Sequence, residues 1–264
     1  MPTLRIALIQ KASSLDPVQN RLGLSVVSPL VGEGPAPVDL VVFPEAFARD
    51  FGPPGSDIAE FAESTERDDP FMAALTEIAE DHTVTLVAGM FERSADPQRP
   101  YNTLVVVDRH GLAAKYRKIH LYDSFGYKES ERLLAGDIEP VLVDVNGLKV
   151  GLMTCYDLRF PELARELAKR GADVIVVPSA WVAGPAKVDH WRTLVKARAI
   201  ENTVYVVAVG QPGPRYTGHS LVVSPMGDVL VEGGAHEQIL DATLERSLVV
   251  DARAQNPSLA NRRF

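Results

Sequence analysis

The chain has 264 residues, of which 46 % are hydrophobic and 23 % charged, a composition typical of a globular protein with a substantial core. The formal net charge of -8 argues against nucleic acid as a partner, because neutralising phosphates requires clustered Lys and Arg. Residues 1–10 lack the basic flank and apolar stretch of a signal peptide, and no apolar run approaches the roughly 20 residues of a bilayer span. The single cysteine, Cys155, fits a reducing compartment, so we expect a cytoplasmic protein that does not bind membranes.

The first part of the chain predicts alternating strands and helices. Apolar runs predict strands at residues 4–10, 39–43 and 84–90. Helical patterns lie between them at residues 18–30, where Gly and Pro interrupt the pattern, and at 70–81, which begins with a proline suited to the first helical position.

The middle of the chain predicts antiparallel hairpins, and the rest resumes the alternation. Two pairs of strands, 102–107 with 112–118 and 141–145 with 148–154, flank short turns. The second turn is Asn146-Gly147, a strong two-residue hairpin signal because both positions tolerate positive φ. The later segments follow in order: a helix at 161–170, a strand at 173–177, a helix at 188–202, strands at 204–210, 220–223 and 229–231, and a polar, unpatterned tail after 251.

The order strand, helix, strand, helix, strand therefore occurs twice, with hairpins between the two halves. This order predicts an α/β fold in which two mixed sheets pack face to face with helices outside, a four-layer α-β-β-α sandwich. One doubly wound sheet is the alternative, and the central hairpins disfavour it. No segment has the composition of a linker, so we expect residues 1–264 to form a single domain.

Reactive side chains follow several of the predicted strands. Glu45, Lys118 and Cys155 each lie at or just beyond the end of an apolar run, as do residues 179–181. In open α/β architectures ligands collect beyond the carboxyl ends of the strands. The sequence therefore predicts one pocket in which these residues converge.

Each of the three residues has a chemical and a structural interpretation. Cys155 can be a nucleophile whose pKa is lowered by the helix that starts near Pro161, or a buried cysteine that only packs. Glu45 can be a general base, a partly exposed loop glutamate, or the partner of a helix cap. Lys118 can stabilise a thiolate or an oxyanion, or it can be a solvated strand end.

Three segments resemble the motifs of the nitrilase superfamily, the carbon–nitrogen hydrolases. Residues 44–47 (PEAF) are similar to its first glutamate motif, 117–121 (RKIHL) to its lysine motif and 155–162 (CYDLRFPE) to its cysteine motif. The blocks 198–202 and 218–220 resemble later parts of the family pattern, so the resemblance covers nearly the whole chain.

The resemblance implies a Glu45–Lys118–Cys155 triad that hydrolyses an amide through a thioester and releases ammonia, without metal or cofactor. It also implies a second glutamate between the lysine and the cysteine. Glu129 fits the family pattern better than Glu131. The family commonly forms dimers, so a homodimer is expected.

The residues of the cysteine motif resemble those of the ω-amidase and deaminated-glutathione amidase branch, which implies a small ω-amide of a dicarboxylic acid as substrate. N-carbamoyl amino acids are the second choice of substrate. We expect Tyr156, Arg159 and Trp181 to line the pocket. Arg159 can clamp a substrate carboxylate or form an ion pair with Glu162 or Asp157, while Trp181 can be pocket wall or core and Tyr156 can act through its backbone alone.

Two rival functions remain at this stage. A Cys–His hydrolase would use His120 or His219 as its base, although hydrogen bonding away from the reaction explains both histidines better. A binding or regulatory module would keep the fold without activity. Metal-site and phosphate-loop motifs are absent, and the pairs Gly32/Gly34 and Gly233/Gly234 are interpreted as loop positions.

Overall fold

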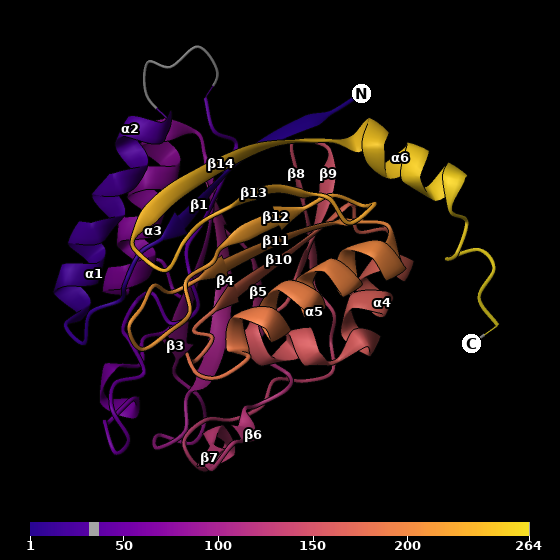
Figure 1. Ribbon diagram of the computed structural model, residues 1–264. Coiled ribbons are helices and arrows are strands. Elements are labelled where there is room, and N and C mark those ends of the chain that lie inside the picture. The colour runs from indigo at the N-terminus through magenta and orange to yellow at the C-terminus, as the bar shows by residue number, and fades with distance from the viewer. Residues whose placement is uncertain (32–36, 264) are drawn as a thin grey trace.

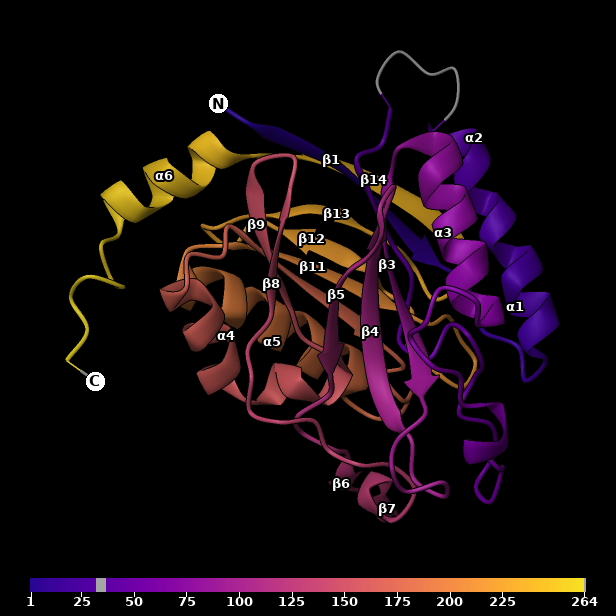
Figure 2. The ribbon, with the colours of Figure 1, turned by 180° about the vertical axis from the view of Figure 1, so that it is seen from behind.

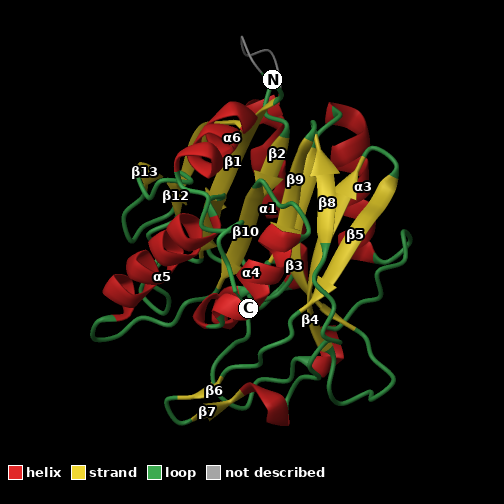
Figure 3. Cartoon of the chain, turned by 90° about the vertical axis from the view of Figure 1, so that its right-hand side faces the viewer, coloured by secondary structure: helices red, strands yellow, loops and turns green. Residues whose placement is uncertain are grey.

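Two six-stranded sheets form the centre of the protein in a computed structural model that describes residues 1–31 and 37–263 (Figure 1). The first sheet contains, in spatial order, β14 (Gln238–Glu245), β1 (Thr3–Gln10), β2 (Leu40–Val42), β3 (Thr85–Glu92), β4 (Tyr101–Asp108) and β5 (Gly111–Arg117). The second contains β13 (Val229–Glu232), β12 (Leu221–Val223), β11 (Tyr205–Gly210), β10 (Val174–Ser179), β9 (Leu148–Leu152) and β8 (Leu142–Val145). A small hairpin of β6 (Asp123–Ser124) and β7 (Tyr127–Lys128) lies beyond one end of the sheets (Figure 3).

Helices cover the outer faces of both sheets, so the molecule has the expected four α-β-β-α layers (Figures 1 and 2). The first sheet is covered by α1 (Pro17–Gly23), α2 (Ser28–Val31) and α3 (Pro70–His82), and the second by α4 (Pro161–Lys169) and α5 (Lys187–Asn202). The last helix, α6 (Arg246–Gln255), extends away from the layers. Four 3₁₀ turns complete the fold: η1 (Leu24–Val27), η2 (Ala59–Phe61), η3 (Glu129–Glu131) and η4 (Cys155–Arg159).

The alternation of side chains along β1 shows how the layers are assembled. Leu4, Ile6 and Leu8 pack in the core between the two sheets, whereas Ala7 and Ile9 pack under the helices of the first sheet. This is the two-residue period of a strand that is buried on both faces. Strands β10 and β11 are likewise buried along their whole length, which explains why their sequences are continuous apolar runs.

Strand direction brings the predicted reactive residues to one edge of the sandwich. Strands β1, β2 and β3 are parallel, and because β4 is antiparallel to both of its neighbours, β5 runs in the same direction as β3. Strands β9, β10 and β11 are parallel in the second sheet. The segments that follow β2, β5, β9 and β10 therefore leave the sheets at a common edge, which is where ligands bind in such folds.

Most of the expected elements are confirmed, including the Asn146-Gly147 turn, whose residues have φ values of 50° and 81°. The C-terminal prediction is wrong. Strand β14 was not expected, and the supposedly unpatterned tail begins inside α6. Strand β14 is half exposed at the sheet edge and pairs with β1, so its mixed polar sequence gives a weak strand signal. Gly32 and Gly34 lie outside the described residues.

Within residues 1–31 and 37–263, no helix combines the length and the apolar character needed to cross a bilayer.

Candidate active site

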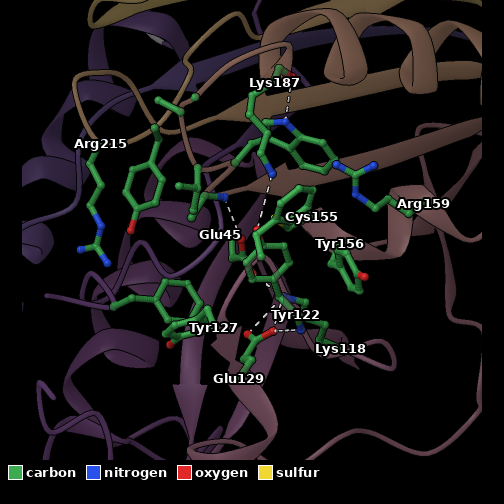
Figure 4. Close-up of a pocket in the computed structure, with 18 of the residues that line it drawn as sticks. Glu45, Lys118, Tyr122, Tyr127, Glu129, Cys155, Tyr156, Arg159, Lys187 and Arg215 are labelled. Carbon is green, nitrogen blue, oxygen red and sulfur yellow. Dashed lines mark hydrogen bonds and ion pairs between the residues drawn. The ribbon is translucent and has the colours of Figure 1, made fainter. Parts of the chain in front are cut away.

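Glu45, Lys118 and Cys155 meet at one cavity of about 430 Å³ at this edge of the sandwich (Figure 4). Glu45 follows β2, Lys118 follows β5 in the same sheet, and Cys155 follows β9 in the facing sheet. The convergence predicted from the strand ends is therefore present in the structure, although the three residues come from segments far apart in the sequence.

The Lys118 ammonium is held between two buried carboxylates. Its Nζ donates to Glu45 Oε1 at 3.0 Å and to Glu129 Oε1 and Oε2 at 3.1 and 2.9 Å. Lys118, Glu45 and Glu129 are each no more than 2 % exposed. Glu131, the alternative second glutamate, is exposed and pairs with Lys128 instead. Glu129 is thus the glutamate that reaches the cluster.

Asn102, which the sequence analysis missed, ties the two carboxylates together. Its Nδ2 donates to Glu45 Oε1 at 2.7 Å and to Glu129 Oε1 at 3.3 Å. Asn102 lies near the start of β4, and because β4 is antiparallel to β3 and β5, its first residues lie at the same edge as their ends. A buried polar residue in an otherwise apolar strand is the only sequence signal that could have identified it.

Backbone groups fix the remaining side of Glu45. The Ala180 N–H, just after β10, donates to Glu45 Oε2 at 2.7 Å and so links the two sheets through the carboxylate. Gly89 on β3 permits the close approach of the Glu45 backbone. A Cβ atom at that glycine would lie 2.4 Å from the nitrogen of Ala46 and 2.9 Å from the Glu45 Cα.

Cys155 sits at a tight turn between β9 and η4, with a φ of 46°. Asp157 closes this turn, because its Oδ2 accepts the Thr154 N–H at 2.9 Å. Asp157 also accepts from the Tyr116 hydroxyl at 2.6 Å and from the His120 N–H at 3.1 Å. The buried Asp157 carboxylate therefore connects the lysine motif to the cysteine motif.

The histidines do not support a Cys–His hydrolase. His120 Nδ1 lies 2.7 Å from Asp157 Oδ1, and its ring stacks on Phe160. His219 Nδ1 lies 3.0 Å from the Gly233 carbonyl oxygen. Neither histidine lines the cavity that contains Cys155, so both serve hydrogen bonding around the site.

The electrostatics of the site correct one expectation. Burial, followed by the neighbouring Glu45 carboxylate, raises the pKa of the Cys155 thiol well above its usual range, and the Lys118 charge offsets this only in part. The expected lowering by the following helix is wrong, because the thiol is buried beside a carboxylate. Lys118 is also buried, yet Glu129 and Glu45 raise its pKa well above the usual value. The site thus joins a neutral thiol, a carboxylate and a permanent ammonium.

The three residues predicted to contact substrate, Tyr156, Arg159 and Trp181, all line the cavity. Arg159 forms no ion pair with Asp157 or Glu162 in the described part of the chain, and its guanidinium lies 4.8 Å from the centre of the Trp181 ring. Several other wall residues were missed, among them Tyr122 and Lys187, neither of which follows a predicted strand directly.

Comparisons with known proteins agree with this geometry. The family model "Carbon-nitrogen hydrolase" matches residues 5–254. The chain belongs to the carbon–nitrogen hydrolase family. It is an amidase of that family and hydrolyses carbon–nitrogen bonds of small amides, as its resemblance to the nitrilase superfamily implied.

Three similar proteins match most or all of the chain. A Mycobacterium tuberculosis protein named only as a hydrolase is 41 % identical over 98 % of this chain and 95 % of its own length. The mouse omega-amidase is 36 % identical over 100 % and 96 %. A deaminated glutathione amidase from Synechocystis is 35 % identical over 86 % of each chain.

Solved structures of the family have the same fold. Saccharomyces cerevisiae Nit3, of the nitrilase superfamily, superposes with a TM-score of 0.87 at 29 % identity, covering 100 % of this chain and 97 % of that one. A Nesterenkonia amidase superposes with a TM-score of 0.81 at 30 % identity, covering 98 % and 94 %. In that structure the acetamide moiety of fluoroacetamide is covalently added to the active-site cysteine.

Proposed function

We propose that Cys155, Glu45 and Lys118 are the catalytic triad of this amidase and that Glu129 completes it. The observation that supports these roles is a single buried cluster in which the Lys118 ammonium bonds to both glutamates beside the only thiol of the chain. Such a cluster supplies a nucleophile, a proton acceptor and a positive charge for a developing oxyanion, which are the requirements of acyl transfer.

In the first half-reaction, Cys155 Sγ attacks the amide carbon while its proton passes to Glu45. Because the pKa of the thiol is raised, proton transfer accompanies attack and no stored thiolate is needed. The oxyanion of the tetrahedral intermediate is stabilised by Lys118 and the backbone N–H of Tyr156. Glu45 then protonates the leaving nitrogen, the carbon–nitrogen bond breaks, ammonia leaves and a thioester on Cys155 remains.

In the second half-reaction, water attacks the thioester and gives a proton to Glu45. Collapse of the second tetrahedral intermediate breaks the carbon–sulfur bond, returns that proton to the sulfur and releases a carboxylic acid. Lys118 does not act as the base in either half, because its raised pKa keeps it protonated. Glu129 holds the Lys118 ammonium in place with two hydrogen bonds.

We further propose that the substrate is a small ω-amide of a dicarboxylic acid. The cavity walls are mostly apolar and aromatic, while Arg159 offers a guanidinium whose Nε and Nη2 atoms have no hydrogen-bond partner among the described residues. A carboxylate fits this guanidinium in bidentate geometry. The names of relatives, an omega-amidase and deaminated glutathione amidases, support the same class of substrate.

The setting of the enzyme is part of the proposal. A single unpaired thiol used as a nucleophile suits the cytoplasm, and no membrane contact is proposed. A homodimer is supported by exposed apolar side chains: Ile200 on α5 is 45 % exposed and lies against the turn at Gly227, beside the exposed Met226. We propose residues 1–264 as one domain with one active site.

The test is a hydrolysis screen that measures ammonia release from α-ketoglutaramate, deaminated glutathione, succinamate and carbamoyl-β-alanine. Turnover of one of the first three, and its loss in Cys155→Ser with binding retained, is the expected result. Preferred hydrolysis of carbamoyl-β-alanine would indicate that the substrates are N-carbamoyl amino acids. Binding of these amides without any turnover would indicate a binding or regulatory protein that lacks activity.

Peptide mapping after acid quench tests the intermediate directly. Acid quench of the wild-type enzyme during turnover should trap the acyl group on Cys155, whereas Glu45→Gln, which lacks the proton acceptor of both half-reactions, should trap none from an amide. An acyl group found on any other residue, or full activity in Cys155→Ser, would contradict the triad.

A further inference from the structure

Lys187 is a buried ammonium that the proposed reaction does not use. It is the first residue of α5, and it follows Ala186, which has a φ of 58°. The Lys187 carbonyl oxygen accepts the Trp181 indole N–H at 3.0 Å, so the backbone of the lysine is fixed to the wall of the cavity. Its side chain is 9 % exposed and reaches into the cavity that contains Cys155 (Figure 4).

The described residues give Lys187 no carboxylate partner. Its Nζ lies 3.5 Å from the Tyr122 hydroxyl and 3.7 Å from the centre of the Phe125 ring. Neither group carries a negative charge, and a cation–π contact with the exposed Phe125 does not neutralise the ammonium. Burial, followed by the positive charge of Arg159, lowers the pKa of Lys187.

Two other cationic side chains that line the same cavity do have carboxylate partners. Lys118 bonds to two glutamates, and Arg215 on the opposite wall donates to Asp50 Oδ1 at 2.7 Å. Arg159, like Lys187, has no carboxylate partner among the described residues, and its buried Nε and Nη2 atoms form no hydrogen bond there. Two cations that repel each other and have no carboxylate partner among the described residues therefore line one wall of the cavity.

Burying an ammonium and a guanidinium without protein counter-ions is unfavourable, and an anion bound in the cavity would stabilise both charges. We propose that Lys187 and Arg159, with the Tyr122 hydroxyl, form a two-cation site for the carboxylate end of the substrate, so that Lys187 is a specificity-determining residue. This assignment rests on the proposed function, because it identifies which group of the amide substrate the wall binds.

The chemistry of the three groups is complementary. The guanidinium of Arg159 offers a planar fork to both carboxylate oxygens, whereas the ammonium of Lys187 acts as a compact charge toward one of them. Tyr122 adds a neutral hydroxyl donor, because burial and then Cys155 raise its pKa. The reacting amide would then extend from this wall toward Cys155.

The experiment compares succinamate with butyramide, two amides of equal chain length of which only the first has a carboxylate. In Lys187→Met, the ratio of kcat/KM for succinamate to that for butyramide should fall about 10- to 100-fold, the range expected for loss of one charge-assisted hydrogen bond. The change should reside in KM for succinamate rather than in kcat. Lys187→Arg should restore much of the ratio.

Lys196→Met is the matched control, because Lys196 is exposed on the same helix and its loss changes the net charge equally. This variant should keep the wild-type ratio. Lys187→Met should unfold at the same temperature as wild type or higher, since it removes a buried unpaired charge. A ratio within about twofold of wild type in Lys187→Met would overturn the proposal while leaving the amidase function intact.

A binding measurement separates failure of this proposal from failure of the proposed function. If wild type hydrolyses neither of these amides nor any amide of the earlier screen, the proposed function fails. Calorimetry with succinate and the Cys155→Ala protein then tests the anion site alone. If the Cys155→Ala protein binds succinate and the Cys155→Ala/Lys187→Met protein does not, the proposed anion site is supported. Equal affinity with and without Lys187, or no binding of succinate at all, overturns it.

The pH dependence of KM provides an independent readout. The charge of Lys187 is present below its pKa, which burial and Arg159 lower below the usual lysine value. KM for succinamate should therefore rise with pH before the ordinary lysine range is reached, while KM for butyramide stays level. Lys187→Arg should abolish this rise. Tyr122 and Cys155 also face the ammonium, and their raised pKa values keep them neutral over the same range.

Discussion

Replacing Asn102 by Asp tests whether the glutamate cluster controls proton transfer. Asn102 Nδ2 is 2.7 Å from Glu45 Oε1 and 3.3 Å from Glu129 Oε1, in a region where all three side chains are buried. The substitution keeps the shape of the side chain but places a third carboxylate beside two others. Among the described residues, Lys118 is the one cation that bonds to the two glutamates.

The expected effect follows from Coulomb's law. Two like charges about 4 Å apart repel by about 4 kcal/mol at an effective dielectric constant of 20, which corresponds to about 3 pKa units. One carboxyl group of the cluster should therefore bind a proton near neutral pH. Asn102→Ala only removes a hydrogen bond to a charged group, worth about 1.5–3 kcal/mol, and adds no charge, so its effect on the pH profile should be smaller.

The assay is the pH profile of kcat for ammonia release, measured with thermal unfolding of each variant. Asn102→Asp should have low activity at neutral pH that recovers as pH rises, with the acid limb moved upward by about 2–3 units. Asn102→Ala should show a smaller shift in the same direction. Recovery at alkaline pH distinguishes a protonated base from a damaged fold. An acid limb that is unmoved in Asn102→Asp would refute the role assigned to the cluster.

Three further predictions concern the support of the site and the state of its nucleophile. Gly89→Ala should lose kcat and about 1–3 kcal/mol of stability, because the new Cβ would lie 2.4 Å from the Ala46 nitrogen, whereas Gly234→Ala, with open space around it, should be neutral in activity and thermal unfolding. Asp157→Asn should lower the free energy of unfolding by about 2–4 kcal/mol in denaturant titrations, since an amide cannot accept all four hydrogen bonds; unchanged stability would contradict this account. Because the pKa of Cys155 is raised, its thiolate should absorb in the ultraviolet only at alkaline pH, measured as the difference between wild type and Cys155→Ala. A thiolate band at neutral pH would show that burial does not dominate the pKa of Cys155.

Much of the active site could be predicted because its chemistry follows strand ends. Glu45, Lys118 and Cys155 each lie directly after an apolar run, and the parallel strands put those ends at one edge. Glu129 required the family pattern, since its own segment has only a short 3₁₀ turn. Asn102 gave only the weak signal of a polar residue in a strand, because it lies near the start of an antiparallel strand and reaches the same edge from the opposite direction.

The sequence by itself determined the alternation of strands and helices and the residue types available for acyl transfer, since both depend on local pattern. Tertiary structure decided what those residues can do. The pKa of Cys155 depends on its burial beside Glu45, which reverses the effect expected from the helix that follows it. Lys187 and Arg159 line one wall without a carboxylate partner only because the segments that follow β9 and β10 meet there, and no property of either segment alone predicts that meeting.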